Sequence, residues 1–165
     1  MLRPKFNKDY IRKELLRQRQ EIVHGIVDIC HYVGEKFVKE ARQAMSIDSG
    51  IFPNNDYTDR TGNLRQSIGY ILILDGKVLF SKQPGNPEGM SYYNFLIGSL
   101  PKAKGLWLVG MAGMEYASYV ESMGYNVITS QSEMVFVDLS KMLKQYAEAS
   151  GRKLSNTGGI LNSML

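Results

Sequence analysis

A stripe of apolar side chains in the first quarter of the chain constrains the fold more than any other feature. Its members recur at intervals of three, four or seven residues: Ile11, Leu15, Ile22, Ile26, Ile29, Val33 and Phe37. This spacing predicts one long amphipathic helix, with Asn7 as its N-cap. The stripe widens from Ile22 onward, so we expect the second half of the helix to be buried and the first half to be more exposed.

A β-hairpin is the second strong signal. Asp75-Gly76 stands between two runs rich in β-forming residues, 68–74 and 77–81. An Asp-Gly pair in this position predicts a hairpin with a two-residue turn. The first run is apolar on both faces, so one face should pack on the long helix. The other face needs a cover, which we expect to be another element or a second subunit.

The rest of the chain predicts short elements and one last helix. The short elements are a helix over 90–100, a strand over 105–111, a helical turn over 116–123 and a fourth strand over 125–128. The last helix should have Ser130 or Ser132 as its N-cap and end near Ala149. Together these predict a single α+β domain over 1–149, in which a long N-terminal helix packs on a small antiparallel β-sheet with a C-terminal helix. Residues 150–165, rich in Gly, Ser and Asn, predict a flexible C-terminal tail.

Basic residues gather at the start of the chain, in residues 1–19, which we call the arm. They are Arg3, Lys5, Lys8, Arg12, Lys13, Arg17 and Arg19, against Asp9 and Glu14, which gives the arm a net charge of +5. The whole chain carries +4, so the remaining residues sum to −1. A basic helical arm favours an acidic partner surface or a phosphate backbone, with a solvated helix end as the plainer interpretation.

The sequence patterns of common enzymes are absent. There is no Gly-rich phosphate loop, His-Glu-x-x-His, Cys-x-x-Cys or Gly-x-Ser-x-Gly, and the single cysteine, Cys30, excludes an internal disulfide. His24, Asp28, His31 and Glu35 share one face of the long helix. The two histidines are two turns apart, roughly 10 Å along the axis, which is too far for one metal ion. We therefore expect no enzyme, no cofactor and no metal site, and no segment long and apolar enough to cross a membrane.

The most informative stretch links the long helix to the hairpin. It contains Asp59, Arg60, Thr61, Gly62, Asn63, Leu64, Arg65, Gln66, Ser67 and Ile68. Thr61 can cap a short helical turn over 61–67, and Gly62 allows a tight entry into it. Leu64 falls on the buried side. Arg60 and Arg65 are left outward, where they can pair with acidic groups on a neighbouring subunit; a plain capped turn is the alternative interpretation.

This stretch resembles the Thr-Gly-x-Leu-Arg-x-Ser-Ile motif of the minor tail component, or head–tail joining (neck, tail-completion), protein family of tailed bacteriophages. A second match, to the family's Tyr-Ala-x-Tyr-Val-Glu segment, consists of Tyr116, Ala117, Tyr119, Val120 and Glu121. The order of elements is also similar, and the resemblance covers roughly residues 7–148. In the family Gly-Thr follows the glutamate closely, whereas here Ser122, Met123 and Gly124 follow it. The segment 82–104 and the tail after Ser150 have no counterpart.

The resemblance implies a non-enzymatic virion structural protein. Such a chain forms a homo-oligomeric ring in the phage neck, joins head to tail and lines the DNA path. Its implied partners are portal-side adaptor or stopper proteins and tail proteins, with non-specific contact to DNA in the lumen. Its implied location is the neck or tail region of the virion, after synthesis in the host cytoplasm. The alternative, from charge alone, is a nucleic-acid-binding or assembly-helper protein that acts through the arm, and an enzyme with an unrecognised site is a third.

Overall fold

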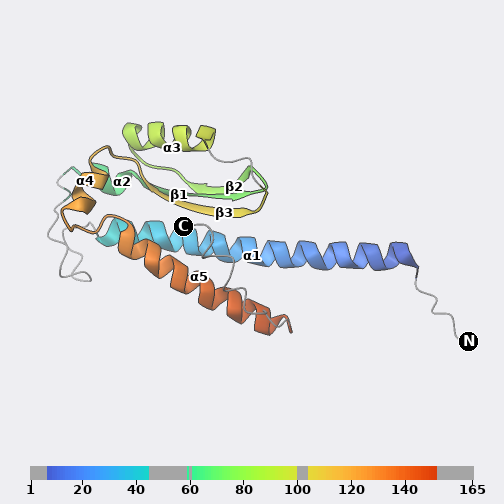
Figure 1. Cartoon of the computed structure of the whole chain (residues 1–165). Helices are drawn as coiled ribbons and strands as arrows, with labels where there is room; N and C mark the ends of the chain where they lie inside the picture. Colours follow the sequence, from blue (N-terminus) through green and yellow to red (C-terminus); the bar gives the residue numbers. More distant parts are fainter. Residues whose placement is uncertain (1–6, 45–58, 60, 100–103, 152–165) are drawn as a thin grey trace, which may run out of the picture.

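The computed structural model describes residues 7–44, 59, 61–99 and 104–151; residues 152–165 of the expected tail lie outside this described part. Figure 1 shows three layers, in which α3 (Pro87–Ser99) covers one face of a small sheet, and α1 (Lys8–Ala44) and α5 (Thr129–Ala149) lie on the other side. Two short helices, α2 (Asn63–Gln66) and α4 (Ala117–Ser122), lie at the end opposite the N-terminus. The expected α+β arrangement is confirmed.

The sheet has three antiparallel strands in the order β2-β1-β3. They are β1 (Ile68–Leu74), β2 (Lys77–Lys82) and β3 (Leu106–Ala112). The hairpin between β1 and β2 is the one expected, because Asp75 has a φ of 50° and Gly76 a φ of 78°, as a type I′ turn requires. Strand β3 begins beside this turn, where Gly105 N donates to Asp75 Oδ1 at 2.8 Å.

The central strand β1 is buried on both faces, and its side chains alternate between two apolar clusters. Tyr70 and Leu72 belong to the cluster that includes the buried face of α1. Ile71 and Ile73 belong to the second cluster, together with Tyr93 of α3. The cover of the second face is therefore α3, an element of the same chain, so this face needs no second subunit.

Helix α1 changes character along its length, as its apolar stripe predicts. The described part of the arm is mostly exposed, including the apolar residues Ile11, Leu15 and Leu16. From Val27 onward the helix buries one face against the sheet and α5. Asn7 is confirmed as the N-cap, because its Oδ1 accepts a hydrogen bond from the backbone N–H of Asp9 at 3.0 Å.

Two expectations for the segment before α5 are wrong. No strand forms over residues 125–128, because the carboxylate of Glu121 accepts two backbone N–H groups of this segment that sheet pairing would need. Helix α5 begins at Thr129, so neither Ser130 nor Ser132 is its N-cap. The helical turn expected over 61–67 is present but shorter, as α2.

Two glycines of α1 lie under aromatic rings. A Cβ atom at Gly34 would lie 2.6 Å from Cδ2 of Tyr70, and one at Gly25 would lie 2.4 Å from Cζ of Tyr146. Both distances are far shorter than an ordinary carbon–carbon contact. The missing side chains therefore let α1 approach β1 and α5 closely, and α1 continues as one helix through both positions.

Substitution Gly34→Ala is expected to lower the free energy of unfolding, measured by denaturant titration. Alanine normally stabilises a helix interior by about 1 kcal/mol relative to glycine. Here the new methyl group would overlap the fully buried ring of Tyr70, and overpacking of this kind costs about 1–3 kcal/mol.

The matched control is Gly98→Ala, because nothing lies within 4 Å of a Cβ at this position in α3. This change should raise the free energy of unfolding by about 0.5–1 kcal/mol. A Gly34→Ala protein as stable as the Gly98→Ala protein would contradict the close packing of α1 on β1.

Candidate interaction surfaces

The stretch that resembles the first family motif folds into a capped corner between α1 and β1. Oδ2 of Asp59 accepts a hydrogen bond from Arg65 N at 2.8 Å. Oγ1 of Thr61 accepts one from Asn63 N at 3.3 Å, but the residue at the N-cap position of α2 is Gly62, so the cap expected from Thr61 is displaced by one residue. The shorter capping bond comes from Asp59, a role that sequence reasoning did not assign. Gly62 enters the turn at a φ of 70°, which strains any residue with a Cβ atom.

The same corner is joined to the segment that precedes α4. Leu64 is fully buried in the core, as expected. Ser67 donates its hydroxyl hydrogen to Leu64 O at 2.7 Å, and Ser67 O accepts a bond from Gly113 N at 3.1 Å. The side chain of Arg65 is half-buried and forms no ion pair with the described residues. Arg60 lies outside the described residues.

The second motif forms α4, and its glutamate caps the start of α5. Ala117 and Val120 are buried, and the half-buried Tyr116 packs against the same core cluster. Glu121 caps α5 from a distance in sequence, because its two carboxylate oxygens accept bonds from the backbone N–H groups of residues 127–129 at 3.0–3.3 Å. A negative charge at this position also favours the positive end of the helix dipole. Glu121 is therefore a structural residue.

Gly124 and Tyr119 are the other two residues of this segment. Gly124 has a φ of 86° and turns the chain from α4 toward α5, so its role is conformational. Tyr119 is 65% exposed and has no part in the core. The structure thus brings both motifs together at one end of the molecule, while the arm lies at the other end (Figure 1).

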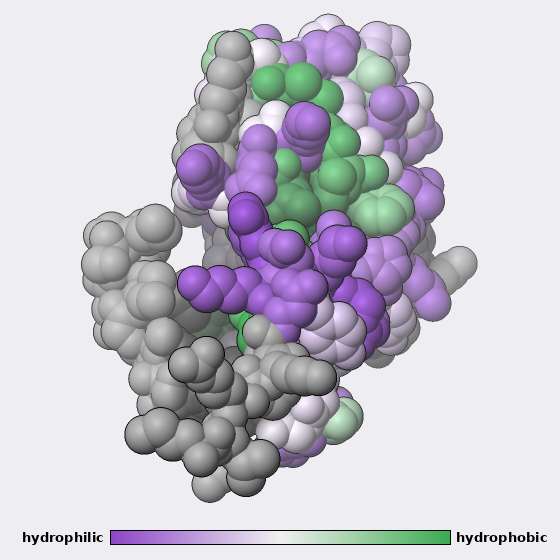
Figure 2. All heavy atoms as spheres, turned by 90° about the vertical axis from the view of Figure 1, so that its right-hand side faces the viewer, coloured by the Kyte–Doolittle hydropathy of each residue, from purple (hydrophilic) through white to green (hydrophobic). Residues whose placement is uncertain are grey.

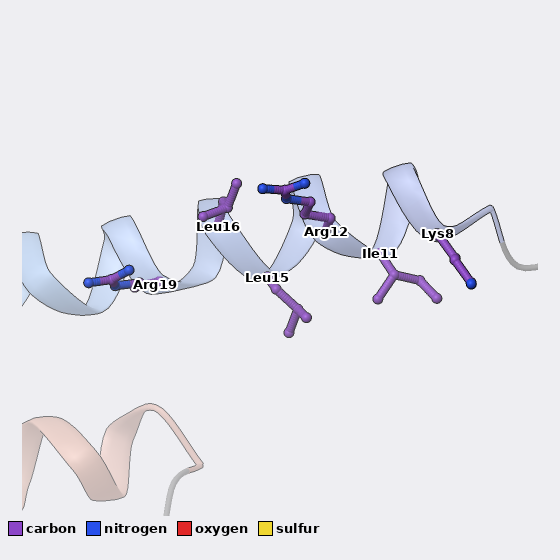
Figure 3. Close-up of a pocket in the computed structure, with 6 residues that line it drawn as sticks. All are labelled: Lys8, Ile11, Arg12, Leu15, Leu16 and Arg19. Atoms are coloured by element: carbon purple, nitrogen blue, oxygen red, sulfur yellow. The ribbon is translucent and has the colours of Figure 1, made fainter.

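The arm extends α1 beyond the part that α5 and the sheet cover (Figure 1). One side of it combines apolar and basic side chains, which Figure 3 shows and which we call the arm face: Lys8, Ile11, Arg12, Leu15, Leu16 and Arg19. This side continues the stripe that is buried further along the helix. Arg3 and Lys5 lie outside the described residues. The arm is therefore an amphipathic helix whose apolar side has no cover from the described part of its own chain.

Ion pairs along the arm leave this face free. Arg17 donates to Glu14 at 2.7 Å and also pairs with Glu21. Its hydrogen bond, together with one from Gln18, lowers the pKa of Glu14 to about 2. Both acidic partners of Arg17 therefore lie within its own helix. Lys8, Arg12 and Arg19 form no ion pair with any described residue.

Further exposed apolar residues lie above the arm. Figure 2 views the molecule from the end that carries the arm, and shows hydrophobic residues gathered over the layer of α3 and the sheet, above a band of hydrophilic residues. Exposed members of these elements are Phe95 and Ile97 of α3 and Val78 and Leu79 of β2. Strand β2 is an edge strand of the described sheet, and such edges are typical sites of association.

The polar residues expected on one face of α1 are not all solvated. Tyr70 OH lies 2.6 Å from His31 Nδ1 and 3.2 Å from Glu35 Oε1; the tautomer of His31 sets which group donates in the first contact. Lys82 donates to the other oxygen of Glu35 at 3.3 Å. Burial, and then the charge of Glu35, raise the pKa of Tyr70. This network fixes the tyrosine between α1 and β1, and the described residues contain no group of three or more metal-ligand side chains.

Among the described residues, no helix has the length and apolar character that crossing a membrane requires.

Comparisons of the chain with protein-family models, curated proteins and solved structures found no match. The functional interpretation therefore depends on the sequence and geometry of the chain itself.

Substitution Glu121→Ala is expected to lower the free energy of unfolding by about 1–2 kcal/mol, because α5 loses its capping acceptor. Chemical denaturation followed by circular dichroism measures the change. The control is Glu133→Ala, an exposed acid in the first turns of the same helix, which should change stability by no more than about 0.5 kcal/mol. Equal effects of the two substitutions would mean that Glu121 contributes charge alone and no cap.

Proposed function

We propose that this chain is a non-enzymatic virion structural protein of a tailed phage. It is a subunit of a homo-oligomeric ring in the neck, joins head to tail and lines the path of the DNA. The observation that carries the proposal is the position of the two motif-like segments in the fold. They are distant in sequence but lie at one joint, where the N–H of Gly113, just before the second segment, donates to Ser67 O, and most of the described motif residues cap, turn or fill that joint.

Support for a ring comes from the uncovered surfaces. A subunit that acts alone has no use for an amphipathic arm whose leucines face solvent, since exposed apolar patches of this kind mark association sites. The mechanism is geometric: the α+β body repeats around an axis, and the arms reach neighbouring subunits. Portal-side adaptor or stopper proteins and tail proteins contact the two sides of the ring. Arg60 and Arg65 are the residues proposed for ion pairs between subunits or layers.

The arm also bears on the alternative of a nucleic-acid-binding or assembly-helper protein. Its free cations, Lys8, Arg12 and Arg19, suit a phosphate backbone. They are interleaved with Ile11 and Leu15 on the same face, and aliphatic side chains gain nothing from phosphates. The arm face therefore favours a protein surface, and DNA contact in the lumen remains a secondary, non-specific role.

Quantitative mass spectrometry of purified phage particles tests the proposal. The chain should be present at a low, fixed copy number relative to the major capsid protein, because one ring serves each particle. The control is a non-structural protein of the same phage, which should disappear on purification. Absence of the chain from finished particles would contradict the proposal and leave the assembly-helper or nucleic-acid-binding function as the better explanation.

A further inference from the structure

One motif residue has no structural role in the described fold. Tyr119 is 65% exposed, whereas its motif neighbours are buried or cap α5. Met123 follows it by four residues at the end of α4, and Glu115 lies in the turn before α4. Met123 is 57% exposed and Glu115 is exposed without an ion pair to any described residue. These three residues, which we call the α4 face, combine two exposed apolar side chains with one exposed acid at and beside α4.

The arm face at the opposite end has the complementary chemistry. Ile11 and Leu15 supply apolar surface, and Leu15 is 61% exposed. Lys8, Arg12 and Arg19 supply positive charge next to it. The net charges of the arm and of the rest of the described chain also have opposite signs. The described part of the arm holds five basic and two acidic residues, a net +3, while the other described residues hold nine basic and twelve acidic, a net −3.

Two arms cannot easily cover each other. In a symmetric pair of arms, the cations of both copies would share one seam, and like charges in a contact are destabilising. The cover of the arm face must therefore combine apolar side chains with acids. The α4 face offers both, and a tyrosine in addition, which suits a stacking arginine and is enriched at the centres of protein interfaces.

We infer that the arm of one copy docks on the α4 face of the next copy. Ile11 and Leu15 pack against Tyr119 and Met123, and an arm arginine pairs with Glu115. Because the two faces lie at opposite ends of the molecule (Figure 1), the contact is heterologous: each copy gives an arm and receives one. Heterologous contacts close into rings when the rotation permits. The inference deepens the proposed ring function and rests on it for the claim of closure.

Cross-linking between two single-cysteine variants tests the contact. Leu15→Cys and Tyr119→Cys proteins, both full-length, are mixed at high concentration and treated with a short thiol-specific cross-linker. Native Cys30 can stay, because it is buried and its burial raises the pKa of its thiol. The expected main product is the mixed Leu15→Cys/Tyr119→Cys dimer, identified by mass spectrometry. Phe95→Cys replaces Tyr119→Cys in the control, since Phe95 is equally exposed, at 64%, but lies on α3.

Charge reversal then tests the pairing itself. Arg12→Glu with Arg19→Glu in the Leu15→Cys protein should lower the yield of the mixed dimer about tenfold or more. Glu115→Arg in the Tyr119→Cys protein should restore much of it. Lys141→Glu, on the exposed side of α5, is the matched control and should leave the yield unchanged. All variants should keep the unfolding temperature of the parent protein, because the altered residues are not in the core.

The outcomes separate this inference from the proposed function. A mixed dimer no more abundant than the Phe95→Cys control, or a predominance of dimers between identical variants, overturns the contact. Binding of the arm to lipid vesicles or to duplex DNA in place of a second copy also overturns it. If the chain is found in particles but the contact fails, the ring function stands with another interface. If the contact forms but the chain is absent from particles, the proposed function fails alone.

Discussion

Strand β1 is paired on both edges and covered on both faces, and the positions of most other elements follow from this. Its two partners are β2 and β3, and its two covers are α1 and α3. Complete burial of a strand is favourable only when both faces are apolar and every backbone group is paired. Tyr70 is the exception that the fold accommodates, because its ring packs over Gly34 and its hydroxyl lies between His31 and Glu35.

The elements farthest from β1 carry the exposed surfaces on which the proposed contacts rest. The arm lies beyond the reach of the sheet and of α5, and α4 lies at the opposite end with one side toward solvent (Figure 1). Capping acids hold this second end together. Asp59 closes α2 and Glu121 closes the start of α5. What remains exposed there, above all Tyr119, is available to a neighbour without cost to the fold.

Local patterns in the sequence predict much of this structure. The apolar stripe predicts α1 and the loss of burial along the arm, and Asp75-Gly76 predicts the hairpin. The register shift between Leu72 and Ile73 is not predicted. The strand expected over 125–128 does not form, and the reason is physical. β-Forming residues indicate a strand only where their N–H groups are free to pair. Here Glu121 accepts those groups. Caps made by residues several positions away, such as Asp59 and Glu121, leave no periodic signal.

Tertiary contacts explain the other features that the sequence did not predict. The role of Gly34 depends on a ring that is distant in sequence, and the cover of β1 by α3 depends on a segment, 82–104, that the family resemblance does not extend to. Most of the described motif residues hold the joint together, and among them Tyr119 has a largely exposed side chain, at 65%. A motif identifies a shared local structure more readily than it identifies a contact surface.

Electron microscopy of phage produced without this chain tests the central claim most directly. If the chain is a neck subunit that joins head to tail, infected cells that lack it should yield DNA-containing heads and complete tails that are not joined, and supplying the protein should restore joined particles. Joined and infectious particles in normal numbers would contradict the account, because a subunit that connects head to tail cannot be dispensable for their connection.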